Sequence, residues 1–152
     1  MGWKARDIPD QSGKVAVVTG GNGGLGLETS RQLDGYFASN QRRFDLPIDW
    51  SLSHGFARGV LRATAGVPFG DITTYGRMAR AAGSPRGARA AGNALGSNPI
   101  PIVVPCHRVL HADGTLGGYG GVTYSDRQAT LAIKRRLLGL EGSWPVYGYS
   151  TD

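Results

Sequence analysis

The sequence predicts a mainly α (α+β) fold, in which a helix-turn-helix, winged-helix-like domain follows a short strand-loop-helix fragment. Three observations support this expectation. Apolar residues recur at helical spacing in several segments after residue 53, two of these segments flank a tight glycine-containing turn, and the chain begins with an apolar run before a glycine loop. The 152 residues, 40% hydrophobic and 18% charged, suffice for one domain of ordinary size, or one domain plus a fragment, and exclude a large multidomain enzyme.

The N-terminal segment, residues 1–34, has the pattern of a strand, a glycine loop and a helix, expected at residues 15–18, 19–26 and 27–33. This pattern resembles the opening βα unit of the short-chain dehydrogenases, in which such a loop lets a dinucleotide pyrophosphate approach a helix N-terminus. No further βα alternation follows, and the Tyr-x-x-x-Lys of that family is missing because Gln128 stands four places after Tyr124. We therefore interpret the segment as a structural fragment that does not hold NAD by itself.

Two amphipathic helices are expected next. Ser53 can cap a helix that carries Phe56, Val60 and Ala63 on one face and ends at Gly66. Thr73 or Thr74 can cap a second helix, which carries Tyr75, Met78, Ala79 and Ala82 and stops at Gly83. Ser84-Pro85 then supplies a cap and a first-turn proline for a third helix that runs to about Gly96, which completes the helix-turn-helix pattern.

The third helix has an unusual composition of arginine, alanine and glycine. Gly87 and Gly92 each lower its intrinsic stability by about 1 kcal/mol relative to alanine, so another requirement must favour them. Small side chains allow close approach to a neighbouring helix or to a DNA groove. Arg86 and Arg89 stand three residues apart on one expected face, which favours DNA.

The last helix is expected to open at Ser125, which lies at capping-box spacing from Gln128. Its inward residues are expected to be Ile133, Leu137 and Leu140. Basic residues at positions 134–136 lie late in the helix, where its dipole favours cations, and the helix should end near Gly142. Residues 143–152 form a tail without a recognisable signal.

The formal net charge of +6 is concentrated in the middle of the chain, since residues 35–121 hold nine Arg and four acidic residues, a net of +5. Arginine grips phosphate bidentately, so nucleic acid is the expected partner, although charge alone fits a solvated basic surface equally well. One cysteine excludes an intramolecular disulfide and a Cys-based zinc cluster. A cytoplasmic protein is expected, because no apolar stretch reaches membrane-spanning length and charged residues occupy the N-terminus.

The single cysteine, Cys106, follows a proline-punctuated apolar run at residues 98–104. Such a cysteine is most often an inert, buried small hydrophobe. Here His107 and Arg108 follow it directly, and a positive neighbourhood favours the nucleophilic thiolate. Neighbours in an extended chain point to opposite sides, so Cys106 and His107 should not touch unless the backbone turns, and a water between them would carry the proton.

From about residue 36 to 142 the chain resembles the catalytic, DNA-binding domain of the O6-alkylguanine-DNA alkyltransferases, also called methylated-DNA–protein-cysteine methyltransferases. The motifs that carry the resemblance are Asn98-Pro99-Ile100-Pro101, Pro105-Cys106-His107-Arg108-Val109, Thr74-Tyr75-Gly76, Arg89-Ala90-Ala91-Gly92, Gly117-Gly118-Tyr119 and the stretch from Lys134 to Gly142. The chain is thus divided into a fragment at 1–34, an alkyltransferase-like domain at 35–142 and a tail at 143–152. The usual N-terminal domain of the family is replaced by the dehydrogenase-like segment.

The resemblance implies DNA repair by one irreversible transfer of an alkyl group from guanine O6 to Cys106, without cofactor or metal. Glu141 would orient His107, which would draw the thiol proton through water, while Tyr75 would assist the leaving guanine and Asn98 would brace the turn before Cys106. The implied partner is double-stranded DNA, bound by a monomer that flips the base out of the duplex. The implied DNA-binding residues are Tyr75, Arg86, Arg89, Ala90, Gly92 and Arg108, and those of the substrate pocket are Val109, Tyr119, Gly120 and Lys134.

Residues 122–133 make a longer connection than is usual in the family, so Glu141 is expected to be displaced relative to His107. Two alternatives therefore stay open. The first is a protein that binds alkylated DNA without efficient transfer. The second is a nucleotide-binding fragment that uses Gly20, Gly24 and Gly26. His54 and His111 have no partner that the sequence identifies.

Overall fold

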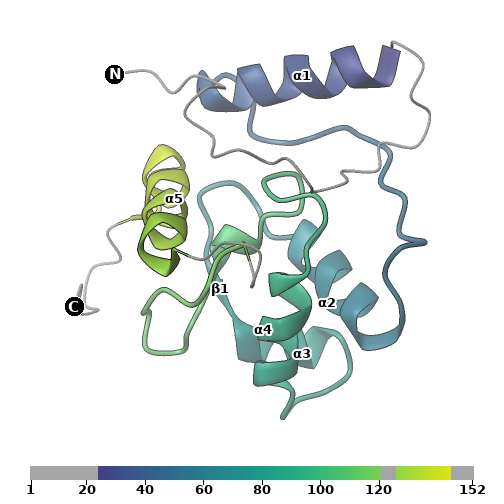
Figure 1. The fold of residues 1–152 in the computed structure, drawn as a ribbon, viewed down its shortest axis with the longest axis vertical. Helices are drawn as coiled ribbons and strands as arrows, with labels where there is room; N and C mark the ends of the chain where they lie inside the picture. Colours follow the sequence, from purple (N-terminus) through teal and green to yellow (C-terminus); the bar gives the residue numbers. More distant parts are fainter. Residues whose placement is uncertain (1–23, 121–125, 145–152) are drawn as a thin grey trace.

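The computed structural model describes residues 24–120 and 126–144, and within them the chain is mainly helical with one two-stranded sheet. The element order is α1 (Gly24–Phe37), α2 (Gly55–Ala65), β1 (Thr73–Thr74), α3 (Tyr75–Ala81), α4 (Ala88–Gly96), the 3-10 turn η2 (Cys106–Arg108), β2 (Val109–Leu110) and α5 (Arg127–Leu140). Figure 1 shows α2, α3 and α4 grouped on one side of the sheet, α5 on the other, and α1 across one end. The predicted mainly α fold is confirmed.

Helix α1 is longer than the helix expected at residues 27–33, and the expected strand and most of the glycine loop lie outside the described residues. Its C-terminal half packs onto the rest of the molecule. The Gln32 amide exchanges two hydrogen bonds with the backbone of Asp45, at 3.0 and 2.8 Å, and Tyr36 is fully buried. The domain boundary expected after residue 34 therefore falls inside α1, which continues to Phe37.

Helix α2 forms because Val60, Leu61 and Thr64 share one buried face. Its N-cap is His54, which makes no side-chain capping bond, so the expected cap at Ser53 is wrong by one residue. The reason is Gly55, whose φ of +50° turns the chain into the helix at that point.

The helix-turn-helix formed by α3 and α4 is present. Thr74 caps α3, with its hydroxyl accepting a bond of 3.3 Å from the Arg77 amide, and Gly83 ends the turn with a φ of +86°. Helix α4 begins three residues later than expected, because Ser84 starts a separate turn closed by the Gly87 amide at 2.9 Å. Arg86 therefore belongs to this turn rather than to the helix.

The hydrophobic core joins the three-helix unit, α2 to α4, to the segment around Cys106. It is built from Val60, Leu61, Val67, Met78, Ala79, Ala91, Ala94, Leu95, Val104, Cys106 and Val109. Strands β1 and β2 pair in parallel, with Thr73 opposite Val109 and Thr74 opposite Leu110. The residue that caps α3 is thus in register with the strand that directly follows the Cys106–Arg108 turn.

Helix α5 is capped by Asp126, whose carboxylate accepts from the amides of Gln128 and Ala129 at 2.9 and 3.1 Å. This N-cap replaces the one expected at Ser125. The buried face carries Thr130, Lys134, Leu137 and Leu138. Leu137 is inward as expected, whereas the half-buried Ile133 and Leu140 flank this face. Gly142, at a φ of +73°, ends the segment where it was expected to end.

Candidate active site

Cys106 is held in the tight turn η2 rather than in an extended strand. Its amide bonds the Val104 carbonyl at 2.8 Å, and the Arg108 amide bonds the Pro105 carbonyl at 2.9 Å. Buried Asn98 braces this segment, because its Nδ2 donates to the Val104 carbonyl at 2.8 Å. Since the backbone turns at Cys106, the opposite-side geometry of an extended chain does not apply to Cys106 and His107.

His107 and Glu141 form a pair buried from solvent. Nε2 of His107 lies 2.8 Å from Oε1 of Glu141, and both side chains have no exposed surface. The other ring nitrogen, Nδ1, is buried without a hydrogen-bond partner among the described residues. Glu141 stands at the C-cap of α5, and this helix carries it to His107. The expected displacement of Glu141 by the longer connection is therefore wrong.

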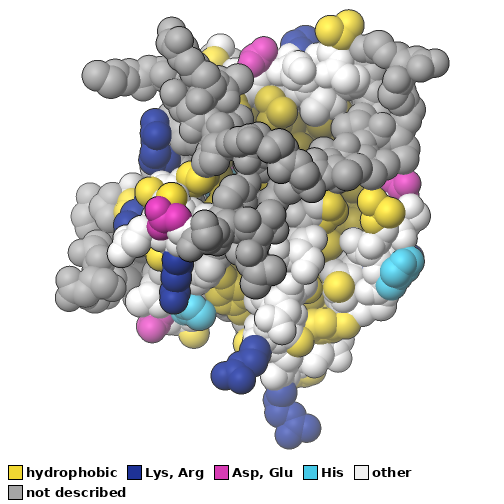
Figure 2. Space-filling view, viewed as in Figure 1, with side chains coloured by type: hydrophobic (Ala, Val, Ile, Leu, Met, Phe, Trp, Pro, Cys, Tyr) yellow, Lys and Arg dark blue, Asp and Glu magenta, His cyan; other side chains and the backbone are white. Residues whose placement is uncertain are grey.

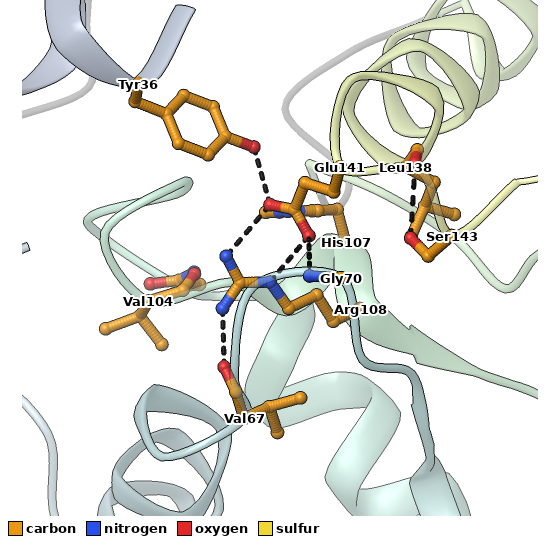
Figure 3. Close-up of polar contacts among 10 residues, drawn as sticks. Tyr36, Val67, Gly70, Val104, His107, Arg108, Leu138, Glu141 and Ser143 are labelled. Carbon is orange, nitrogen blue, oxygen red and sulfur yellow. Dashed lines mark hydrogen bonds and ion pairs between the residues drawn. The ribbon is translucent and has the colours of Figure 1, made fainter. Parts of the chain in front are cut away.

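Arg108 joins the same network (Figure 3). Its Nε donates to Oε2 of Glu141 and its Nη2 donates to Oε1, both at 2.8 Å, while Nη1 donates to the Val67 carbonyl. The residue is only 5% exposed. The expectation that Arg108 contacts DNA is wrong, because its guanidinium neutralises a buried carboxylate that would otherwise lack a cation.

The protonation states of the pair follow from these contacts. Burial opposes ionisation of Glu141, but hydrogen bonds from His107 and Arg108 outweigh it and lower its pKa to about 2. Burial lowers the pKa of His107, and the bond to Glu141 opposes that change. At neutral pH Glu141 is thus a carboxylate beside a neutral imidazole. A carboxylate only accepts, so Nε2 carries the ring proton and Nδ1 keeps a free lone pair.

A cavity of about 790 Å³ opens in front of Cys106. It brings together six of the expected site residues, which are Tyr75, Arg89, Gly92, Cys106, Tyr119 and Gly120. Cys106 lines this cavity although the residue is only 7% exposed. Val109 and Lys134 were expected in the pocket, but both are buried behind its wall, where Lys134 Nζ donates to the Val109 carbonyl at 2.7 Å.

Tyr75 forms one wall of the cavity, and its ring is fixed on several sides. His111 lies against it at 5.1 Å between ring centroids, Lys134 Nζ lies 5.8 Å from its centroid, and Gly92 leaves room for it. A Cβ at Gly117 would collide with the Tyr75 hydroxyl. Burial, reinforced by the charge of Cys106, raises the pKa of Tyr75 to about 12, so the hydroxyl stays protonated at neutral pH.

Sequence reasoning missed several residues of the cavity, namely Ala88, Asn93, Leu95, Gly96, Ser97, His111, Gly118, Arg127 and Thr130. His111 had no identified partner, yet it lines the cavity and its ring lies against that of Tyr75 at a tilt of 48°. His54 also has a partner, since its Nδ1 lies 3.2 Å from Nη2 of Arg58. The only signal for His111 was its place four residues after His107, which does not specify a contact.

An exposed basic surface adjoins the cavity. Arg89 and Ala90 are exposed on α4, Arg86 is exposed in the turn before it, and Arg77 and Arg80 are exposed on α3. Figure 2 shows basic side chains projecting from the end of the molecule that α3 and α4 form. This surface suits a polyanion, and Arg89 connects it to the cavity.

The fold and the site define a helix-turn-helix protein in which a buried cysteine, supported by a His–Glu–Arg network, opens into a cavity beside a basic helix. Residues 55–143 match the family model of the 6-O-methylguanine DNA methyltransferase, DNA binding domain. The methylated-DNA–protein-cysteine methyltransferase of Mycolicibacterium paratuberculosis is 48% identical over 105 residues, which are 69% of this chain and 62% of the relative. That of Methanosarcina acetivorans is 42% identical over 116 residues, 76% of this chain and 69% of the relative.

The solved structures agree with the sequence relatives. The Mycobacterium tuberculosis O6-methylguanine methyltransferase superposes with a TM-score of 0.67 at 40% identity, covering 77% of this chain and 66% of that one. The M. tuberculosis OGT in complex with DNA gives 0.68 at 41% identity, covering 76% and 65%. The chain belongs to the methylated-DNA–protein-cysteine methyltransferase family. It spans slightly less than two thirds of the length of the Mycolicibacterium relative.

Within residues 24–120 and 126–144, every helix is too short or too polar to span a lipid bilayer. The His, Cys, Asp and Glu side chains of these residues form no cluster of three or more that could bind a metal ion.

Proposed function

We propose that the protein repairs DNA by transferring an alkyl group, such as methyl, from O6 of guanine to Sγ of Cys106, once per molecule. The observation that carries the proposal is the position of the only cysteine in the sequence. Cys106 lines a cavity beside an exposed basic helix, and the next residue, His107, is paired with a buried carboxylate. The names of the relatives point to the same reaction.

In this reaction a carbon–sulfur bond forms while the bond from that carbon to guanine O6 breaks, and the electron pair leaves with guanine. The thiol proton passes through a water to Nδ1 of His107, whose lone pair is free. Glu141 stabilises the imidazolium that results. The Tyr75 hydroxyl donates a hydrogen bond to N3 of the departing guanine. Substrate and protein together supply every atom and electron, so the reaction requires no cofactor.

The partner is double-stranded DNA that contains O6-alkylguanine, and the protein acts on it as a monomer. A guanine inside the duplex cannot reach a side chain that is 7% exposed, so the base must flip into the cavity. Helix α4 approaches the minor groove, where Ala90 and Gly92 permit close contact and Arg89 fills the space that the base leaves. The Cys106 carbonyl and the Gly120 amide contact the guanine edge.

Intact-protein mass spectrometry tests the proposal directly. After incubation with a duplex that carries one O6-methylguanine, we expect each protein molecule to gain one methyl in place of one hydrogen, located on Cys106 by peptide mapping. The Cys106→Ala variant should gain no mass and should retain DNA affinity, and unmodified duplex serves as the control. Arg89→Ala should weaken DNA binding at low salt. An unchanged wild-type mass after complete incubation would reject the transfer.

A protein that binds the lesion without transfer would show salt-dependent DNA binding and no mass change. The displacement of Glu141 that favoured this alternative does not occur, since the carboxylate lies 2.8 Å from His107. The dinucleotide-binding alternative concerns Gly20, Gly24 and Gly26. Gly20 lies outside the described residues, and Gly24 and Gly26 belong to the first turn of α1, so the structure adds no observation in favour of that activity.

A further inference from the structure

The Glu141 carboxylate receives a hydrogen bond from a residue that the reaction above does not use. Oε1 accepts from His107 Nε2 at 2.8 Å, from Arg108 Nη2 at 2.8 Å and from the Tyr36 hydroxyl at 2.7 Å. The first two donors belong to the active-site turn. Tyr36 belongs to α1, 105 positions before Glu141 and outside the residues matched by the family model. Figure 3 shows it reaching the carboxylate from the side opposite Arg108.

The position of Tyr36 is fixed by an aromatic cluster. Its ring centroid lies 5.3 Å from that of Phe37, 5.5 Å from Phe44 and 5.9 Å from Phe69, and the residue has no exposed surface. A phenylalanine would satisfy this packing. The hydroxyl is therefore not required for burial, and a buried hydroxyl is unfavourable unless it is bonded. Its partner here is the carboxylate that holds His107.

We propose that Tyr36 is a positioning residue that sets the proton affinity of His107 through Glu141. A donor on Oε1 takes up part of the negative charge of the carboxylate. Without the Tyr36 hydroxyl, more of that charge faces His107 Nε2, and the imidazolium becomes more stable. Resting His107 would then hold a proton on Nδ1, where the proposed reaction needs a lone pair. The significance of this effect for repair rests on the proposed function, but the effect itself does not.

Other groups that face His107 would not be altered by a change at Tyr36. The charged ones are Arg108 and Lys134, and the thiol of Cys106 is its chain neighbour. Burial and the adjacent Glu141 charge raise the pKa of Tyr36, so the hydroxyl remains a donor throughout the range in which proteins are stable. The substitution Tyr36→Phe thus removes one donor and leaves every formal charge in place.

The test compares wild type, Tyr36→Phe and the control Phe44→Leu, which removes one of the three rings around Tyr36, keeps Phe37 and Phe69 against it and leaves the hydroxyl on the carboxylate. NMR titration of the His107 ring should give a pKa about one unit higher in Tyr36→Phe, a tenfold gain in proton affinity. The rate at which iodoacetamide alkylates Cys106, the single cysteine, should show an acid limb displaced in the same direction. Phe44→Leu should lower stability and leave both titrations unchanged.

If Tyr36→Phe fails to fold, 3-fluorotyrosine at position 36 supplies a stronger donor, and it must move the His107 titration to lower pH. Unchanged titrations in the folded variants, or equal shifts in Phe44→Leu, would overturn the proposal. Neither readout requires DNA. A wild-type protein that takes up no methyl group would therefore reject the proposed function while the Tyr36 result stood on its own.

Discussion

Glu141→Gln removes the negative charge at the centre of the buried network while keeping nearly the same shape. In the folded protein the carboxylate faces His107, Arg108 and Tyr36, and its pKa is lowered from 4.5 to about 2. At about 1.4 kcal/mol per pH unit, the ionised carboxylate stabilises the fold by about 3 kcal/mol at neutral pH. We expect Glu141→Gln to lose about this amount, because Arg108 is left buried without its counter-charge.

The sign of the pH dependence follows from the lowered pKa. The unfolded chain binds the proton first, so the contribution of Glu141 is complete above pH 4.5 and falls as the pH drops toward 2. The difference in unfolding free energy between wild type and variant should therefore shrink to less than half by about pH 3. Urea unfolding followed by tryptophan fluorescence at several pH values measures it. A difference below about 0.5 kcal/mol at neutral pH, the size of an ordinary surface substitution, would refute the reasoning, as would one that is independent of pH.

Two further substitutions test the supports of the site. Gly117→Ala places a Cβ 2.6 Å from Cε2 and Cζ of Tyr75, so the ring must move and single-turnover methyl transfer should slow by about 100-fold. Gly139→Ala is the control, because this exposed position on α5 lies outside the cavity and its Cβ would meet nothing within 4 Å; equal rates in the two variants would contradict the contact. Asn98→Ala breaks the bonds to the Val104 carbonyl and the Ile100 amide and should lower the unfolding free energy by about 2 kcal/mol in urea titrations. Ser97→Ala, at an exposed neighbour, should stay within about 0.5 kcal/mol of wild type, and a similar loss in both would count against the bracing role of Asn98.

The features that could be predicted from the sequence depend on short-range patterns. The cap at Thr74 and the stop at Gly83 are local signals, and the structure has both. Other helices begin at residues different from those expected, because tertiary packing determines where they start. Gly87 closes against Ser84 and Phe56, where a Cβ would stand 2.7 Å from the serine hydroxyl, so the turn at Ser84–Gly87 prevents α4 from starting earlier.

The contacts that could not be predicted join distant segments. Arg108 follows His107 in a basic stretch, and nothing local indicates that it pairs with a carboxylate 33 positions later. No local pattern around Tyr36 indicates that its hydroxyl reaches the same carboxylate. The longer connection at residues 122–133 suggested a displaced Glu141, but α5 begins at Arg127 and takes up most of it. The positions of Arg108 and Tyr36 thus depend on tertiary contacts that the local sequence does not indicate.

The short parallel pairing of β1 with β2 has a consequence for local opening. Thr73 and Thr74 lead directly into α3, and Val109 and Leu110 directly follow the Cys106–Arg108 turn. The hydrogen bonds between the two strands therefore connect the start of α3 to the end of that turn. Separation of β1 from β2 would therefore loosen the start of α3 and the Cys106–Arg108 turn at the same time. Amide protons on the two strands should consequently exchange with deuterium as one cooperative unit, so the thiol and the helix that follows Thr74 share a common protection against fluctuation.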